Sequence, residues 1–162
     1  MNRRKVPADH FKIPESVLVV IHTADLDVLL IERADRPGFW QSVTGSKDTL
    51  EESLVDTCLR EVEEETGIGI GTSAVPSAAL LDWQLAHAYE IWPAWRRRYA
   101  PGVKTNTEHV FSLRVPRGTP VRLAPREHIA FEWLGFEAAA ARCFSPTNAE
   151  AIRQLPRRAV CS

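Results

Sequence analysis

The stretch Arg60-Glu-Val-Glu-Glu-Glu-Thr-Gly-Ile68 indicates both the fold and the chemistry of this 162-residue chain. Gly67 is expected to end a helix here, because glycine readily adopts the left-handed conformation on which helices close. At about 100° per residue, Glu61, Glu64 and Glu65 then lie within an arc of roughly 100°. Three carboxylates therefore share one edge of the predicted helix.

This arrangement of acidic side chains destabilises an isolated helix. Glu61 and Glu65 form a like-charge pair four residues apart, which costs a few tenths of a kcal/mol. Glu63, Glu64 and Glu65 also lie at the carboxyl end, where the helix dipole disfavours anions by about 0.3–1 kcal/mol each. Such a run can be a solvated acidic face. A hard divalent cation such as Mg²⁺ would instead relieve the repulsion, and Arg60 can pair with Glu64 across one turn.

The elements around this stretch predict an α/β or α+β fold with a mixed sheet. The acidic helix is expected to begin at about Thr49 or Leu50 and to end at Glu65. Its core-facing side is predicted to consist of Val55, Leu59 and Val62. Apolar, β-branched runs predict strands at 16–22, 28–33, 39–43, 79–86, 88–92, 108–115 and 129–134. Two short helices are predicted at 136–142 and 147–155, and a basic, aromatic loop at 94–106.

The composition is that of one globular domain spanning residues 1–162, with 1–11 and 156–162 expected to be loose. Apolar residues make up 44% and charged residues 25% of the chain, and the net charge of −1 gives no overall basic field for a nucleic-acid polymer or a membrane. The apolar run 17–21 is too short for a membrane span or a signal sequence, so we expect a cytoplasmic protein. Cys58, Cys143 and Cys161 are interpreted as reduced thiols, because their spacing fits neither a disulfide framework nor a zinc site.

The acidic stretch is part of a longer motif. Gly45, Glu52 and the segment 60–68 resemble the Nudix box, whose pattern is G-x5-E-x7-R-E-U-x-E-E-x-G-U with U a bulky aliphatic residue. Seven residues separate Glu52 from Arg60, as the pattern requires, whereas the interval from Gly45 to Glu52 is one residue longer. Using Glu51 instead restores the first interval and lengthens the second.

The resemblance to the Nudix family implies a mixed β-sheet sandwiched between α-helices. It also implies hydrolysis of a nucleoside diphosphate linked to another group, with Mg²⁺ or Mn²⁺ held by the glutamates of the box. Here Glu61 and Glu65 would be direct ligands, and Glu64 would be a further ligand or a proton acceptor.

Segments outside the box resemble one branch of the family, the dihydroneopterin triphosphate pyrophosphatases. These segments are 39–46, 98–103, 106–109 and 127–128, together with Trp133. The resemblance implies conversion of dihydroneopterin triphosphate to the monophosphate and pyrophosphate in folate biosynthesis, with additional activity on nucleoside triphosphates such as dATP.

By matching position, the branch also implies residue roles. Glu127 would join the helix glutamates at the metal, and either Glu64 or Glu127 would accept the proton of the attacking water while Glu61 holds the metal. Substrate contacts are implied for Lys12, Arg33, Thr44, Tyr89, Glu90, Ile91, Trp92 and Ser145. His109 and His128 lack a metal-type spacing and are predicted to be structural.

Two other functions share these residues. One is a Nudix pyrophosphohydrolase that removes unwanted nucleoside triphosphates from the nucleotide pool, which would differ only in the pocket for the base. The other is a non-catalytic, nucleotide-sensing Nudix module, but such modules usually lack glutamates of the box. In each case the expected partner is a small molecule, and the sequence leaves the oligomeric state open.

Overall fold

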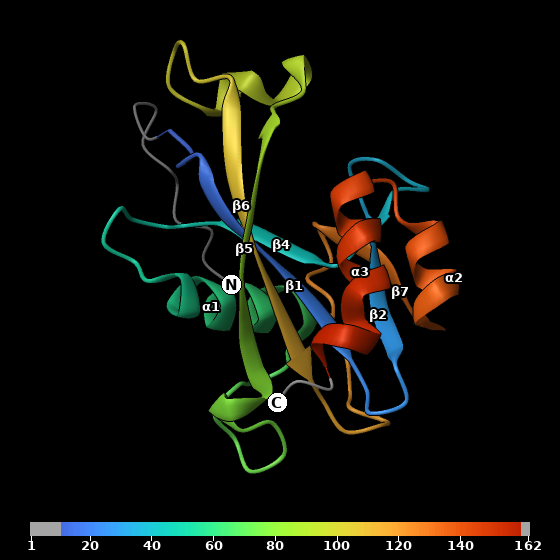
Figure 1. Ribbon diagram of the computed structural model, residues 1–162. Coiled ribbons are helices and arrows are strands. Elements are labelled where there is room, and N and C mark those ends of the chain that lie inside the picture. The colour runs from blue at the N-terminus through green and yellow to red at the C-terminus, as the bar shows by residue number, and fades with distance from the viewer. Residues whose placement is uncertain (1–10, 160–162) are drawn as a thin grey trace.

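A sheet of seven strands forms the centre of the computed structural model, which describes residues 11–159 (Figure 1). Its strands are β1 (Glu15–His22), β2 (Asp27–Arg33), β3 (Trp40–Gln41), β4 (Val43–Ser46), β5 (Leu80–Glu90), β6 (Thr105–Arg114) and β7 (His128–Gly135). The helices are α1 (Leu54–Thr66), α2 (Phe136–Arg142) and α3 (Pro146–Arg158), with two short 3-10 helices, η1 (Ser77–Ala79) and η2 (Pro93–Arg98).

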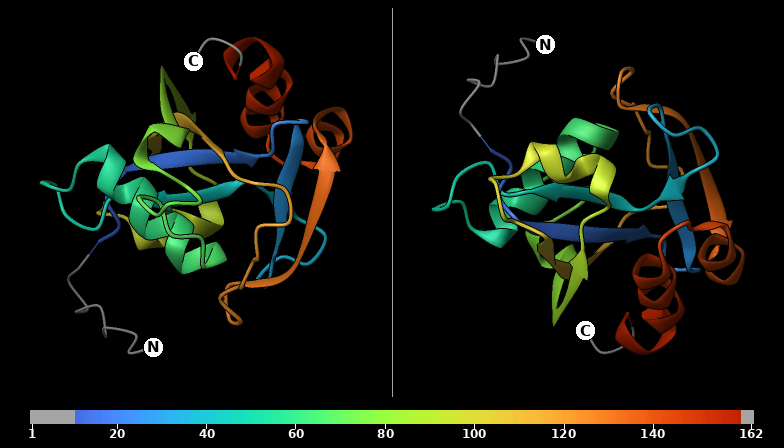
Figure 2. Two further views of the ribbon diagram at one scale, coloured as in Figure 1. Left: turned by 90° about the horizontal axis from the view of Figure 1, so that it is seen from below. Right: turned by 90° about the horizontal axis from the view of Figure 1, so that it is seen from above.

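The sheet is mixed, as predicted. Strand β1 pairs in parallel with β6 and antiparallel with β4, while β5 pairs antiparallel with β6. Strand β2 meets the end of β1 and carries β3 and β7 as antiparallel partners. Figures 1 and 2 show α1 on one side of β1 and helices α2 and α3 on the other. The predicted Nudix arrangement, a mixed sheet between helices, is confirmed.

Two apolar cores lie on the two faces of the sheet, and β1 contributes to both. Val17, Val19 and Ile21 belong to the core that contains residues of α1. Leu18 and Val20 alternate with them and belong to the core beneath α2 and α3. Because neighbouring strand residues point to opposite faces, a strand covered on both sides must be apolar throughout. The uninterrupted apolar run in β1 has this cause.

Helix α1 begins later than predicted, and its buried side is different. Ser53 caps it by accepting a hydrogen bond of 3.0 Å from the Asp56 N–H, so the first turn starts at Leu54. Gly67 ends the helix in the left-handed conformation, with φ of 74°, as predicted. Val55 is 48% exposed and Leu59 only partly buried, so the predicted core-facing side was wrong except at Val62, which is fully buried.

Several other boundaries also differ. The two strands predicted at 79–86 and 88–92 form one strand, β5, which continues through an irregularity where Gln84 adopts a φ of 52°. The strand predicted at 39–43 is divided into β3 and β4, and the predicted loop 94–106 contains η2 and the start of β6.

The chain ends were predicted to be loose at residues 1–11 and 156–162. Residues 156–158, predicted to be loose, continue α3. The other residues predicted to be loose include 1–10 and 160–162, which lie outside the described part of the chain. Of the helices between residues 11 and 159, none combines the length and apolar character that a bilayer crossing requires.

Candidate active site

The carboxyl groups of Glu61 and Glu65 lie against strand β4. Glu65 is 4% exposed, and the side chain of Glu61 is 13% exposed. Gly45 in β4 lies so close to Glu61 that a Cβ atom at this position would overlap the Glu61 carboxyl group. The glycine of the box therefore provides the space that the carboxylate occupies.

Burial makes these carboxyl groups unusual acids. It raises the pKa of Glu61 to about 7, although the adjacent Arg60 opposes the shift. The pKa of Glu65 rises well above its ordinary value, first because of burial and then because of the nearby charges of Glu61 and Glu127. Glu64, at the rim of the site, has a more modestly raised pKa from partial burial. These carboxylates would be stabilised by a cation between them.

A second segment completes the acidic cluster. Potential ligand atoms of Glu65, Glu127 and His128 all lie within 4.8 Å of one another, and His128 Nε2 is 3.7 Å from Glu65 Oε1. Glu65 Oε2 and His128 Nδ1 are buried without a hydrogen-bond partner. The cluster thus suits a divalent cation, which would satisfy the unpaired Glu65 oxygen. Glu127 lies beside Glu65, as the metal prediction requires, and His128, which was predicted to be structural, lies next to both.

Arg60 fixes the orientation of the acidic side chains around it. Its guanidinium donates to both carboxylate oxygens of Glu52 at 3.0 and 2.9 Å, to Glu61 Oε1 at 2.8 Å and to the Ser46 carbonyl at 2.9 Å. A longer ion pair of 3.5 Å reaches Glu64, as predicted. Paired donors of this kind hold a carboxylate in one position.

Glu52 rather than Glu51 therefore occupies the box position. Besides Arg60, it accepts hydrogen bonds from the Asp48 N–H at 3.0 Å and the Thr57 hydroxyl at 2.7 Å. Glu51 is exposed. The additional residue of the motif is accommodated in the turn before α1, and the spacing from Glu52 to Arg60 is preserved.

We expect Glu52→Gln to lower the free energy of unfolding by about 1.5–3 kcal/mol at pH 7, because hydrogen bonds to a charged group are lost. The Arg60 bonds hold the pKa of Glu52 at about 2, below its ordinary value of 4.5. This stabilisation is present above pH 4.5 and is lost as the pH falls through 2. Urea unfolding at pH 7, 4 and 3 should therefore show a shrinking difference between the two proteins. Glu51→Gln is the matched control, and a difference that does not change with pH would contradict the assignment.

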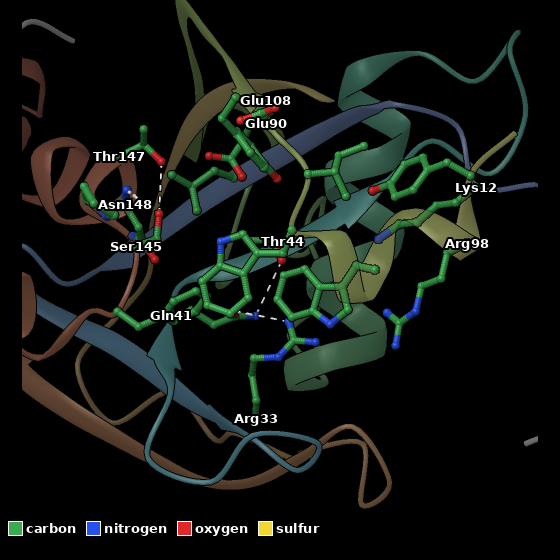
Figure 3. Close-up of a pocket in the computed structure, with 18 residues that line it drawn as sticks. Lys12, Arg33, Gln41, Thr44, Glu90, Arg98, Glu108, Ser145, Thr147 and Asn148 are labelled. Atoms are coloured by element: carbon green, nitrogen blue, oxygen red, sulfur yellow. Dashed lines mark hydrogen bonds between the residues drawn. The ribbon is translucent and has the colours of Figure 1, made fainter. Parts of the chain in front are cut away.

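A cavity of about 350 Å³ opens beside the acidic cluster (Figure 3). All eight residues predicted to contact substrate line it: Lys12, Arg33, Thr44, Tyr89, Glu90, Ile91, Trp92 and Ser145. Further lining residues were not predicted as substrate contacts, among them Gln41, Trp95, Glu108, Phe144 and Thr147. Trp95 and Arg98, which also line the cavity, lie in the segment predicted to be a basic, aromatic loop at 94–106.

Basic side chains connect this cavity with the acidic cluster. A neighbouring cavity of about 460 Å³ is lined by Glu61, Glu65 and Glu127. Lys12, Arg33, Gln41, Thr44 and Arg98 line both cavities. Positive charge thus lies between the acidic cluster and the more apolar of the two cavities.

Arg33 is held at this junction by two groups. Its guanidinium donates to both Asp35 carboxylate oxygens at 2.8 Å and lies 4.9 Å from the centre of the Trp95 ring. Trp95 in turn stacks on Trp92, with ring centres 5.0 Å apart, and so forms part of the cavity wall. Lys12 lines both cavities, where partial desolvation of its ammonium group, followed by the nearby Arg98 charge, lowers its pKa.

An acidic cluster beside a basic junction is typical of proteins that cleave phosphate compounds with a metal ion. Comparison with known proteins identifies the family: the NUDIX domain model matches residues 12–155, and the chain belongs to the Nudix hydrolases. Enzymes of this family generally depend on a divalent metal.

Two relatives and one solved structure are similar to this chain over most of its length. The dihydroneopterin triphosphate diphosphatase of Escherichia coli is 41% identical over 146 residues, covering 90% of this chain and 93% of the relative. The enzyme of the same name from Haemophilus influenzae is 38% identical and covers 89% of this chain and 88% of the relative. A solved structure of the E. coli dihydroneopterin triphosphate pyrophosphohydrolase superposes with a TM-score of 0.80 at 41% identity, covering 89% of this chain and 95% of that one.

Proposed function

We propose that this protein hydrolyses dihydroneopterin triphosphate to the monophosphate and pyrophosphate in folate biosynthesis, with Mg²⁺, or alternatively Mn²⁺, as its metal. Nucleoside triphosphates such as dATP are proposed as additional substrates. The observation that carries the proposal is the basic junction, which joins an apolar cavity of heterocycle size to the acidic cluster. The relatives named above support the choice of substrate.

The metal would be held by Glu61 and Glu65, with Glu64 and Glu127 as further ligands. When bound, Mg²⁺ neutralises charge at the phosphates and lowers the pKa of a bound water. Glu64 or Glu127 accepts the proton of the attacking water, and both are exposed enough for the proton to leave to solvent. The bonds from Arg60 keep Glu61 in place during turnover.

The remaining predicted residues are proposed to bind substrate. Lys12 and Arg33 hold the phosphates at the junction, so that the reacting phosphorus is positioned before attack. Thr44 lies beside them, and the segment from Tyr89 to Trp92 borders the heterocycle. Ser145 has a structural task as well, because its hydroxyl caps α3 by accepting from the Asn148 N–H.

The direct test is pyrophosphate release from dihydroneopterin triphosphate, measured beside dATP, dGTP and other nucleoside triphosphates. We expect the pterin substrate to have the highest kcat/KM, and we expect release to stop with a chelator and return with Mg²⁺. A strong preference for one nucleotide would favour the alternative role in nucleotide-pool sanitation. Binding without any release would favour the sensor module, although the presence of every box glutamate argues against it.

We further propose that the chain acts in the cytoplasm as a single catalytic domain with a small-molecule partner and no membrane or nucleic-acid polymer. The unpaired thiols of Cys58 and Cys143 support a reducing compartment.

A further inference from the structure

One buried acid in the cavity has no part in holding the metal. Glu108 projects from β6 into the cavity wall, is 6% exposed, and does not line the neighbouring cavity of the acidic cluster. Burial raises the pKa of Glu108 to about 7, with a smaller opposing contribution from the Thr147 hydroxyl. Among residues 11–159, no basic side chain counters this effect. A buried carboxyl without a cation is costly unless hydrogen-bond donors reach it.

Glu90, the other acid lining the cavity, has a different environment. Its side chain is 75% exposed and forms a 3.3 Å ion pair with Arg96, so it lies at the rim with a partner of its own. Glu108 is thus the cavity acid whose hydrogen-bonding capacity is directed at the contents of the cavity.

The position of Glu108 separates it from the phosphate end of the cavity. Figure 3 shows Glu108 and Arg33 on opposite sides, with Lys12 and Arg98 away from Glu108 as well. Much of the remaining cavity wall is apolar and aromatic, with Leu18, Ile91, Trp92, Trp95 and Phe144 among its residues. Flat rings pack well in such a space, and about 350 Å³ is enough for a bicyclic heterocycle. A ligand with its phosphates at the junction would therefore present the far edge of its ring to Glu108.

We propose that Glu108 is a specificity-determining residue that binds the adjacent ring N–H and amino group of a bicyclic heterocycle. This donor pair occurs in dihydropterin and in guanine, and it is absent from adenine. The inference rests on the proposed function, which places the phosphates at the basic junction, and it defines the substrate class of that site.

The chemistry of the donor pair explains why a carboxylate suits it. Two parallel N–H groups can each donate to one carboxylate oxygen, which is the arrangement that makes carboxylate recognition strong and directional. Adenine offers a ring nitrogen acceptor at the same edge, which repels the carboxylate. Loss of one charge-assisted bond is expected to reduce kcat/KM by on the order of ten- to a hundredfold.

The test compares dGTP with dITP, which lacks only the 2-amino group, and with dATP. The wild-type protein should cleave dGTP with a kcat/KM at least about tenfold above that of dITP. Glu108→Gln replaces one acceptor by a donor and leaves the shape unchanged. This variant should bring the ratio of dGTP to dITP close to one and leave dATP hydrolysis within about threefold. Turnover of dihydroneopterin triphosphate should fall together with that of dGTP.

Glu132→Gln is the matched control, because Glu132 lies on strand β7 outside the cavity and pairs with Arg142 at 3.0 Å. The control should retain the wild-type ratio. An equal fall for all three nucleotides in Glu108→Gln would indicate a structural role and overturn the proposal, as would a wild-type protein that does not distinguish dGTP from dITP.

A binding measurement separates this inference from the proposed function. Tryptophan fluorescence of the wild-type protein with chelator present reports binding through Trp92 and Trp95, which line the cavity. Tighter binding of dGMP than of dIMP supports the role of Glu108 even if no triphosphate is hydrolysed, in which case only the proposed function fails. Equal binding of the two nucleotides contradicts recognition of the amino group whether or not hydrolysis occurs.

Discussion

Glu65→Gln is expected to reduce kcat/KM for dihydroneopterin triphosphate by about three orders of magnitude, because a metal ligand is worth several kcal/mol of transition-state stabilisation. Glutamine keeps the shape of the side chain and removes its charge. Since Glu65 is 4% exposed, lies against Glu127 and His128, and has one oxygen without a partner, solvent cannot replace the lost interaction with the cation. Pyrophosphate release at saturating Mg²⁺ measures the effect.

Although Glu65→Gln should lose activity, it should not lose stability when metal is absent. A neutral side chain avoids the burial of charge, so the melting temperature with chelator should equal or exceed that of the wild type. Addition of Mg²⁺ should raise the melting temperature of the wild type and have little effect on the variant. Glu63→Gln is the matched control, because Glu63 is exposed on the same helix. Near-wild-type turnover of Glu65→Gln with Mg²⁺ would show that the metal assignment is wrong.

The elements that were predicted correctly depend on local sequence. Strand β1 is a continuous apolar run, and Gly67 ends α1 through its own backbone conformation, which does not depend on how the helix packs. The error at Val55 has an instructive cause. The prediction placed Val55, Leu59 and Val62 against the core, whereas the buried side of the helix contains Cys58, Val62 and Glu65. Apolarity alone could not identify this side, because one of its buried residues is a glutamate.

The candidate site likewise contains residues that local sequence could group and residues that only the folded chain brings together. Residues of the box are close in sequence, so their spacing on one helix was enough to group Glu61, Glu64 and Glu65. His128 reaches Glu65 only because β7 pairs with β2, where His128 lies opposite Arg33. That register depends on the assembled sheet and has no local signature.

The cavity residues around Glu108 could be predicted even less from local sequence. Glu108 and Thr147 come from a strand and a helix that meet only in the folded chain. The segment 106–109 was recognised as characteristic of the branch, but nothing in its sequence indicates that Glu108 faces a cavity while its neighbour His109 points to the other side of the strand.

Gly45→Ala is expected to reduce kcat/KM by about a hundredfold, because displacement of a catalytic group by about 1 Å has effects of this size. The added Cβ would overlap the carboxyl group of Glu61, so this side chain must move and its 2.8 Å bond with Arg60 must change. Gly45 does not require a positive φ, so the backbone accommodates alanine, but the added methyl group at this packed position is expected to lower the free energy of unfolding by about 1–3 kcal/mol. The Mg²⁺ concentration needed for half-maximal activity should rise, while the protein remains folded at the assay temperature.

Gly135→Ala is the matched control, because nothing lies within 4 Å of a Cβ atom at that position. It should leave both the activity and the Mg²⁺ requirement unchanged. A Gly45→Ala protein with wild-type activity would mean that Glu61 does not act from the place where the structure holds it. If Gly45→Ala loses activity and its Mg²⁺ requirement rises while the fold is retained, the close approach of β4 to α1 is what sets the geometry of the metal site. The glycine of the box then acts by leaving room for the carboxylate of Glu61.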